Sequence, residues 1–277
     1  MISIIIINDF DTPKYAQETI SSIKEKIDNV EYEIIVINLK ANSENDLKEG
    51  SKIYQLKTDN FAEAKNFGSS KSKYDFLLFL KAGIVVKINP FVHFFDKFKN
   101  RNFGAIGLKL YDFKNHFKIT FWREIGLSEE VEENAVNKKI FQGNTQKALE
   151  VENRSHDIIS VVRLSGDAMF INKKILTDIG GFNEYLGRYY YDADICKRLM
   201  KKKYVNYFYP FCKLVDLTLP EINTPLYLRS RLRYYKMHNS FVTRFILRIS
   251  LIIKYFFLSL TFNKQNLHSL RSVLFPY

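Results

Sequence analysis

Cysteine is scarce in this sequence: Cys196 and Cys212 are the two cysteines among 277 residues. Two cysteines cannot build a disulfide framework, so we expect a reducing compartment. The sequence has no P-loop and no G-x-G-x-x-G motif, which argues against ordinary Walker and dinucleotide sites. The first residues carry no basic segment before a short apolar run, so we interpret them as a strand and not as a signal peptide.

Hydrophobic and basic residues are abundant instead. Hydrophobic residues make up 46% of the chain and aromatic residues 15%, which excludes a disordered protein. The net charge is +12, and residues 221–277 hold nine Lys/Arg and one acid, a balance of +8 that leaves +4 for residues 1–220. This distribution favours an anionic membrane surface or phosphate-bearing ligands. We expect no nucleic acid as a partner, because no nucleic-acid-binding motif accompanies the charge.

Apolar runs and helix-like segments alternate through the first half of the chain. Ser3–Ile7, Glu33–Ile37 and Tyr74–Leu80 are typical of parallel strands buried on both faces. The alternation predicts an α/β fold with a doubly wound, mostly parallel sheet. In such sheets ligands bind at the carboxyl ends of the strands, where Asp9 and Asn38 follow the first two runs.

The most specific pattern lies between Leu164 and Leu199, in LSGDAMFINKKILTDIGGFNEYLGRYYYDADICKRL. An apolar run predicts a buried strand, and a helix-like segment after it stops at a Gly-Gly pair, as helices often do. Asp192 and Asp194 then open a second helix. Acidic residues in a first helical turn can simply favour the helix dipole. Two carboxylates one residue apart can also supply a general base and a partner that tunes it.

SGDAMFI, GGFNE and YYYDADICKRL resemble the acceptor-site half of family 2 glycosyltransferases, especially the rhamnosyltransferase-like branch. IIIINDFDTP, NFAEAKNFG and KYDFLLFL resemble the family's N-terminal half, so the resemblance covers about residues 3–218. It implies a GT-A fold and transfer of a sugar from a nucleotide sugar to a glycan or lipid-linked acceptor, in cell-surface polysaccharide assembly. It also implies that Asp192 is the base of an inverting displacement, and we expect Asp194 to orient or tune it.

The resemblance implies residues for both substrates as well. Donor contacts are expected from five residues: Asp9, Asn38, Asn60, Asn66 and Lys81. On the acceptor side, Gly166 would allow close approach and Asp167 would bond a sugar hydroxyl, while Trp122 and Arg123 either border the acceptor or serve in packing. Three basic residues of the tail, Arg229, Arg231 and Arg233, either close over the donor diphosphate, meet lipid headgroups or form a solvated face.

Four positions depart from the family pattern. Asn38 replaces an Asp that reads the base, and Tyr191 replaces the Glu before the catalytic Asp. Gly83 stands where the family places carboxylates for Mg²⁺ or Mn²⁺, and Asp216 replaces a His, which leaves it as a weak candidate ligand. Lys81 can neutralise a diphosphate in place of the metal, or it is a solvated lysine at a strand end.

The departures have two consequences for function. They predict that nucleotide-sugar binding and any transfer depend little on Mg²⁺ or Mn²⁺. They also favour, as the alternative function, a non-catalytic glycosyltransferase-like protein that binds a nucleotide sugar, a glycan or an active partner.

The tail contains a long apolar segment, Phe241 to Phe262, with Arg244, Arg248 and Lys254 on one side at about 100° per residue. Each cation at a membrane centre costs about 2.5–3.5 kcal/mol, which argues against a membrane span. We expect an interfacial amphipathic helix, with packing on the sheet or on a partner subunit as the alternative. The predicted organisation is a GT-A-like domain over residues 1–220 and a basic helical tail over 221–277, located on the cytoplasmic face of the cell membrane.

Overall fold

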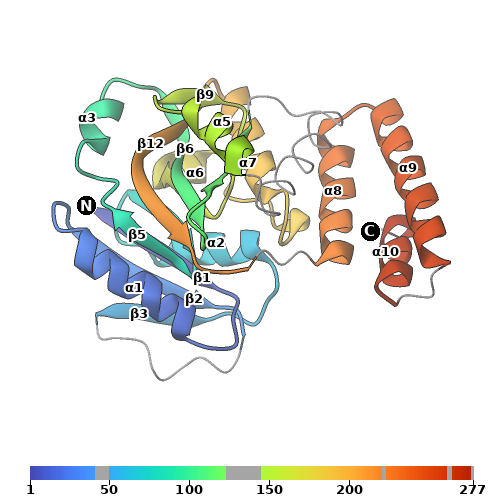
Figure 1. The fold of residues 1–277 in the computed structure, drawn as a ribbon, viewed down its shortest axis with the longest axis horizontal. Coiled ribbons are helices and arrows are strands. Elements are labelled where there is room, and N and C mark those ends of the chain that lie inside the picture. The colour runs from blue at the N-terminus through green and yellow to red at the C-terminus, as the bar shows by residue number, and fades with distance from the viewer. Residues whose placement is uncertain (41–49, 123–144, 220–222, 261–263, 276–277) are drawn as a thin grey trace.

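The computed structural model describes residues 1–40, 50–122, 145–219, 223–260 and 264–275. Within these ranges one large sheet runs through the molecule with helices on both faces, and three C-terminal helices lie to one side of it (Figure 1). The predicted α/β architecture is confirmed.

Eight strands form the main path of the sheet, in the order β3-β2-β1-β4-β11-β6-β12-β5. Their bounds are β1 Ile2–Asn8, β2 Tyr32–Asn38, β3 Ser51–Gln55, β4 Phe76–Lys81, β5 Ile84–Ile88, β6 Phe103–Asp112, β11 Ala168–Asn172 and β12 Val205–Asp216. β1 to β4 are parallel, and β11 is antiparallel to both β4 and β6, so β6 and its parallel neighbour β12 point the same way as β4. Six strands therefore end at one edge of a mostly parallel sheet.

Short strands extend this framework beside that edge. β7 (Phe117–Lys118) pairs with β6, and β9 (Ile159–Val161) pairs with β12. β8 (Phe121–Trp122) and β10 (Arg163–Leu164) form a separate two-stranded sheet. These pairings bring Lys118, Trp122 and Arg163 close to the central strands.

The alternation of side chains along β1 separates two cores. Ile5 and Ile7 pack into a core with α2 (Phe61–Lys71), α6 (Lys173–Asp178) and α7 (Tyr191–Lys201). Ile4 and Ile6 pack into a second core with α1 (Lys14–Lys26) and α3 (Phe94–Phe98). Successive residues of a strand point to opposite faces, which explains why a continuous isoleucine run fits a sheet covered on both sides.

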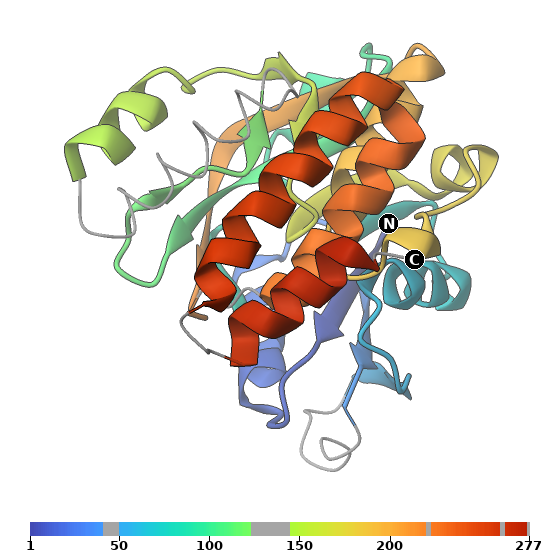
Figure 2. The same cartoon turned by 90° about the vertical axis from the view of Figure 1, so that its right-hand side faces the viewer.

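The remaining helices belong to the edge and the tail. α5 (Thr145–Asn153) precedes β9, and a short 3₁₀ helix, η1 (Glu184–Leu186), precedes α7. The tail folds into α8 (Thr224–His238), α9 (Phe241–Ser259) and α10 (Lys264–Leu274). Figure 2 shows α9 and α10 as the outermost elements on their side of the molecule. None of the helices in the described part of the chain is long and apolar enough to cross a membrane.

A third core joins the tail to the rest of the protein. Leu228 and Leu232 of α8, Leu247 and Leu251 of α9, and Val273 of α10 are buried together with Leu186 and Tyr190. Ser230 also donates a hydrogen bond to the Leu186 carbonyl oxygen at 2.6 Å. The tail is therefore anchored through α8 to the turn that leads into α7.

Two strands differ from the sequence prediction. β5 was not predicted, and the short strand expected from the sequence at Tyr204 to Phe208 continues through Pro210 to Asp216 as one long strand, β12. Proline usually interrupts a central strand because it cannot donate to the ladder. Here the register of β12 against β6 shifts between Tyr209 and Leu214, and this irregularity accommodates the proline.

Candidate active site

Buried polar side chains gather where the parallel strands end. Asn8 and Asp9 close β1, Asn38 closes β2, Lys81 closes β4 and Asp216 closes β12. All of these except Lys81 are less than 9% exposed, which is unusual for polar residues. Their concentration at the carboxyl edge of the sheet marks it as the candidate site.

The predicted donor residues Asp9 and Asn38 lie at this edge, each with a defined partner. Asn38 Oδ1 accepts a hydrogen bond from Asn8 Nδ2 at 3.0 Å. Asp9 Oδ2 forms an ion pair with Arg188, whose guanidinium stacks over the Phe61 ring at 4.4 Å. Burial alone would lower the pKa of Arg188, but Asp9 raises it above its ordinary value.

The second carboxylate oxygen of Asp9 has a different environment. Asp9 Oδ1 is buried and has no hydrogen-bond partner in the described part of the chain. A buried acceptor without a donor is costly. A ligand hydroxyl or N–H group would satisfy it.

Asn60 and Asn66 hold a turn of the protein. Asn60 caps α2 by accepting from the backbone N–H groups of Ala62 and Glu63, and it donates to the Glu184 carbonyl oxygen at 2.9 Å. Asn66 accepts from the Phe182 N–H at 2.8 Å and donates to the Phe182 carbonyl and the Glu184 carboxylate. These contacts explain both amides as clamps on the Gly-Gly-Phe-Asn-Glu turn, and donor contact by either stays a prediction.

Asp192 and Gly166, predicted as base and acceptor contact, lie against each other. The Gly166 N–H donates to Asp192 Oδ2 at 3.3 Å, and the Ala193 N–H donates to Oδ1 at 2.7 Å. A side chain at position 166 would put its Cβ 2.5 Å from the Tyr191 hydroxyl oxygen, so only glycine allows this approach. Asp192 and the loop before β11 therefore form one unit.

A cationic side chain stacked on an aromatic ring lies next to Asp192. Arg163 Nη2 lies 3.2 Å from Asp192 Oδ1, and its guanidinium stacks 4.3 Å from the centre of the Trp122 ring. Aromatic faces are suitable surfaces for the apolar faces of sugars, so Trp122 can border an acceptor as well as fix Arg163. Arg123, its predicted companion, lies outside the described residues.

Asp194, expected to orient or tune Asp192, has partners of its own, and that role stays a prediction. Its side chain is fully buried, accepts from Arg198 Nε at 2.7 Å and lies 2.7 Å from His238 Nε2. Residues two apart on a helix lie about 200° apart, so Asp192 and Asp194 face opposite sides of α7. Asp194 ties α7 to α8 and cannot touch a substrate.

Lys65 is a buried lysine that sequence reasoning missed. It comes from α2, is 2% exposed, and donates through Nζ to the Gly166 carbonyl oxygen at 2.8 Å. Its ammonium also lies 4.6 Å from the Phe79 ring centre. Burial lowers the pKa of Lys65 to about 7, while Asp167 and Asp192 act in the opposite direction. The backbone of Gly166 is thus held by Lys65 at its carbonyl and by Asp192 at its N–H.

Lys118 is a second lysine that sequence reasoning missed. Its Nζ lies 2.8 Å from Asp216 Oδ2 and 3.2 Å from Asp167 Oδ2, so it bridges two strands of the sheet. Burial alone would raise the pKa of Asp167, but Lys118, Lys81 and Lys65 outweigh it and lower that pKa to about 2. Burial would lower the pKa of Lys118, but Asp167 and Asp216 raise it above its ordinary value. Asp167, predicted to bond the acceptor, is therefore an ionised partner of Lys118.

Lys81 and Asp216 belong to the same network through Thr218. Lys81 Nζ donates to Thr218 Oγ1 at 2.8 Å, and Thr218 Oγ1 donates to Asp216 Oδ1 at 2.6 Å. Both oxygens of Asp216 are thus engaged, one by a hydroxyl and one by an ammonium. Neither oxygen of Asp216 is therefore free to coordinate a metal ion.

Position 83 likewise has no space for a side chain. Gly83 has φ +91°, and a Cβ there would lie 2.4 Å from the Thr218 methyl carbon and 3.2 Å from the Tyr15 ring. In the described part of the chain no three His, Cys, Asp or Glu side chains are grouped to hold a metal. Mg²⁺ and Mn²⁺ require several oxygen ligands. The residues at this edge do not fit the divalent cation that the family resemblance implies.

Comparison with known proteins bears on the fold. No protein-family model matches the sequence, and no curated protein matches it. The crystal structure of GalNAc-T7 with UDP, GalNAc and Mn²⁺ matches with a TM-score of 0.59 at 14% sequence identity. The match covers 85% of this chain and 47% of that protein, so this chain spans about half of its length. The chain has a GT-A-like fold.

Within this GT-A-like fold, the three tail arginines do not act as one cluster. On α8, Arg229 and Arg233 lie four residues apart on one face, whereas Arg231 lies about 200° away from Arg229. Arg233 donates to the Tyr185 carbonyl oxygen at 2.8 Å and stacks over the Tyr185 ring. The helix therefore places Arg231 on a different face from Arg229 and Arg233, and contact of these arginines with the donor diphosphate stays a prediction.

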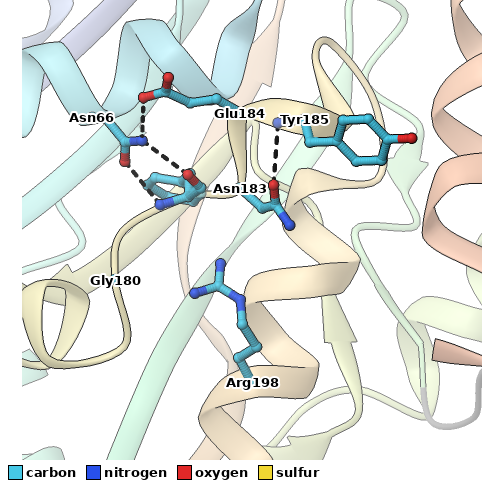
Figure 3. Close-up of a pocket in the computed structure, with 7 residues that line it drawn as sticks. Asn66, Gly180, Asn183, Glu184, Tyr185 and Arg198 are labelled. Atoms are coloured by element: carbon cyan, nitrogen blue, oxygen red, sulfur yellow. Dashed lines mark hydrogen bonds between the residues drawn. The ribbon is translucent and has the colours of Figure 1, made fainter. Parts of the chain in front are cut away.

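The GT-A-like fold also contains a pocket beside the Gly-Gly turn, with a volume of about 390 Å³ (Figure 3). It is lined by Asn66, Gly180, Phe182, Asn183, Glu184, Tyr185 and Arg198. Arg198 donates to Asp194 and to the carbonyl oxygens of Ile179 and Gly181, and Asn66 is bound as described above. These polar groups are already used by the protein, and Asp9, Lys81 and Asp192 do not line this pocket.

Proposed function

We propose that this protein transfers a sugar from a nucleotide sugar to a glycan or lipid-linked acceptor, with Asp192 as the general base. The GT-A-like fold and the buried polar edge formed by Asp9, Asn38 and Lys81 support binding of a nucleotide sugar there. The observation that carries the proposal is the position of Asp192. It is fixed by Gly166 on one side and bordered by Arg163 and Trp122 on the other.

The reaction follows from a carboxylate held in this way. Asp192 accepts the proton of an acceptor hydroxyl, and the hydroxyl oxygen attacks the anomeric carbon of the donor. The bond between that carbon and the diphosphate oxygen breaks, and the diphosphate leaves with the electron pair. A single displacement inverts the anomeric configuration. The Gly166 N–H keeps the carboxylate oriented while the acceptor hydroxyl approaches it.

The proposal is tested by turnover of a panel of nucleotide sugars with glycan and lipid-linked acceptors. Asp192→Asn should reduce release of the nucleoside diphosphate at least about a hundredfold while donor affinity changes little, because the loss falls on the transition state. Asp178→Asn, the same change at an exposed carboxylate of α6, is the matched control and should behave as wild type. Near-normal turnover by Asp192→Asn would contradict the assignment.

A second candidate function is a non-catalytic protein that binds a nucleotide sugar, a glycan or an active partner. The ion pair between Arg163 and Asp192 favours it, because the guanidinium engages the carboxylate that would have to accept the acceptor's proton. Binding of a nucleotide sugar without turnover on any acceptor would support this candidate.

We further propose that the tail rests on the anionic inner face of the cell membrane, where polysaccharide assembly would supply a lipid-linked acceptor. Eight exposed apolar side chains of α9 and its cap carry this proposal: Val242, Phe245, Ile246, Ile249, Ile253, Phe256, Phe257 and Leu260. At about 100° per residue they fall within an arc of about 120°. Leu247 and Leu251 face the opposite way, into the protein.

The charges around this apolar arc favour anionic lipid over a protein partner. Arg248 and Lys254 lie about 60° beyond its two edges, where long basic side chains reach headgroups while apolar residues enter the acyl boundary. The cytoplasmic leaflet is negatively charged, which suits a tail with a balance of +8.

A further inference from the structure

We propose that Lys81, fixed by Thr218 and Asp216, and Lys118 supply the positive charge that holds the donor diphosphate, so that no divalent cation is needed. This inference rests on the proposed function and deepens it. It assigns Lys81 a direct contact with the diphosphate. Asp216 and Thr218 are positioning residues, because they act through Lys81, and Lys118 adds its charge to the same network.

The hydrogen bonds form a directed chain. Lys118 donates to one oxygen of Asp216, and the Thr218 hydroxyl donates to the other. The Thr218 oxygen then accepts from Lys81 Nζ. Because the hydroxyl proton is committed to Asp216, the Thr218 lone pairs face Lys81 and fix its ammonium. Asp216 thereby anchors a lysine at the end of β4.

The exposure of the two lysines permits contact with a ligand. The Lys118 side chain is 32% exposed, whereas that of Asp216 is 5% exposed. Lys81 is half-buried at the carboxyl edge and lies over the Phe10 ring, one residue from Asp9. Asp216 is thus buried, whereas the side chains of Lys81 and Lys118 are partly exposed at the carboxyl edge of the sheet. An anion approaching this edge meets the cations first.

Of the two lysines, Lys81 is the one whose positive charge is not balanced by a nearby carboxylate in the described part of the chain. Lys118 has two carboxylates within ion-pair distance. Lys81 has no carboxylate within that distance in the described part of the chain, and its polar contact is the neutral Thr218 hydroxyl. A diphosphate would supply the missing counter-charge, and ammonium groups are common ligands of phosphate oxygens.

The contacts of Asp216 and Thr218 also disfavour a divalent metal ion at this edge. A divalent cation at Asp216 would lie beside two ammonium groups and would have to displace the Thr218 hydroxyl. The space at Gly83 is filled by the Thr218 methyl group, so a carboxylate introduced there would clash. Fixed ammonium groups can stabilise the charge that develops on a leaving diphosphate without reorganisation.

The test is calorimetry with a panel of nucleoside diphosphates, and with the matching nucleosides, in EDTA and then with Mn²⁺. We expect a nucleoside diphosphate to bind in EDTA, with less than about a threefold change on adding Mn²⁺. Lys81→Met should weaken that binding at least about tenfold and should lessen its salt dependence, while leaving nucleoside binding unchanged. Lys118→Met should also weaken it, and Lys118→Arg should preserve most of the affinity.

Lys174→Met, at an exposed lysine of α6, is the matched control, and thermal unfolding checks each variant. Lys81→Met is the safer variant, because it removes a single hydrogen bond to a hydroxyl. Binding that requires Mn²⁺, or that Lys81→Met leaves intact, would overturn the inference and leave the proposed function standing. Failure of every nucleotide to bind with or without Mn²⁺ would overturn both.

Discussion

Lys65 Nζ donates to the Gly166 carbonyl oxygen at 2.8 Å, while the N–H of the same glycine donates to Asp192. A buried lysine therefore holds the glycine whose N–H orients the candidate base. Lys65 touches no substrate in this arrangement, so it is a positioning residue. Its effects should be measurable both in turnover and in stability.

Replacing Lys65 should impair turnover more than donor binding. In Lys65→Met the Gly166 carbonyl loses its donor, and the loop that holds Asp192 is free to shift. We expect kcat to fall about tenfold or more, with KM for the donor within about threefold of wild type. Lys65→Arg should recover part of the loss, because arginine can donate to the same carbonyl. Steady-state kinetics of the three proteins would decide, and an equal rise in KM with unchanged kcat would contradict the positioning role.

Lys65 also predicts the pH dependence of stability. Its pKa is about 7 in the folded protein and 10.5 for an ordinary lysine, so between these values the unfolded chain binds the additional proton. The free energy of unfolding should therefore rise with pH in this window, by up to about 1.4 kcal/mol per pH unit from this group. Urea unfolding from pH 7 to 9 should show a steeper rise for wild type than for Lys65→Met. Parallel profiles would mean that Lys65 keeps its ordinary pKa.

Mutation of the two α7 carboxylates, Asp192 and Asp194, should change the free energy of unfolding by clearly different amounts. Asp194→Asn leaves Arg198 and His238 without their buried partner, and we expect a loss of about 3 kcal/mol in the free energy of unfolding. Asp192→Asn should cost about 1 kcal/mol or less, because Asp192 sits at the edge of the site and the asparagine oxygen can still accept one of the two N–H hydrogen bonds. Urea unfolding of both variants tests this assignment. If Asp192→Asn lowers the free energy of unfolding more than Asp194→Asn does, the assignment of the two roles is contradicted.

The exposed arc of α9 predicts lipid binding. The triple variant Phe245→Ser, Ile249→Ser and Phe256→Ser should bind phosphatidylglycerol-containing vesicles at least about tenfold more weakly than wild type, because it removes apolar surface that would enter the bilayer. High salt should weaken binding of the wild-type protein. Val92→Ser, at an exposed apolar residue outside the tail, serves as the control. Equal vesicle sedimentation by all three proteins would instead assign this face to protein contact.

The sequence predicted the strands well where apolar runs were continuous. β1, β2 and β4 begin and end within two residues of the expected positions, because isoleucine and leucine runs of this length fit a strand covered on both faces. The polar residues at their carboxyl ends were found for the same reason. The edge of the sheet was therefore predictable, and so was the proximity of Asp9 and Asn38.

The lysines were not predictable, because their roles depend on contacts distant in the chain. Lys65 meets a carbonyl 101 residues away, and Lys118 meets Asp216 across 98 residues from a strand of two residues. No local pattern distinguishes either of them from a solvated lysine. The partner of Asp194 was not predictable for a related reason, since His238 lies in the tail and no local pattern indicates that pairing.

The most direct test of the account is equilibrium binding of intact nucleotide sugars to the full chain in EDTA. The account predicts that at least one member of a panel covering the common nucleotides and hexoses binds at this edge. Asp9→Ala should weaken that binding about tenfold or more, because the free oxygen of Asp9 is lost, whereas Asp178→Ala should leave it unchanged. A panel in which no nucleotide sugar binds, or in which Asp9→Ala binds as tightly as wild type, would contradict the central claim.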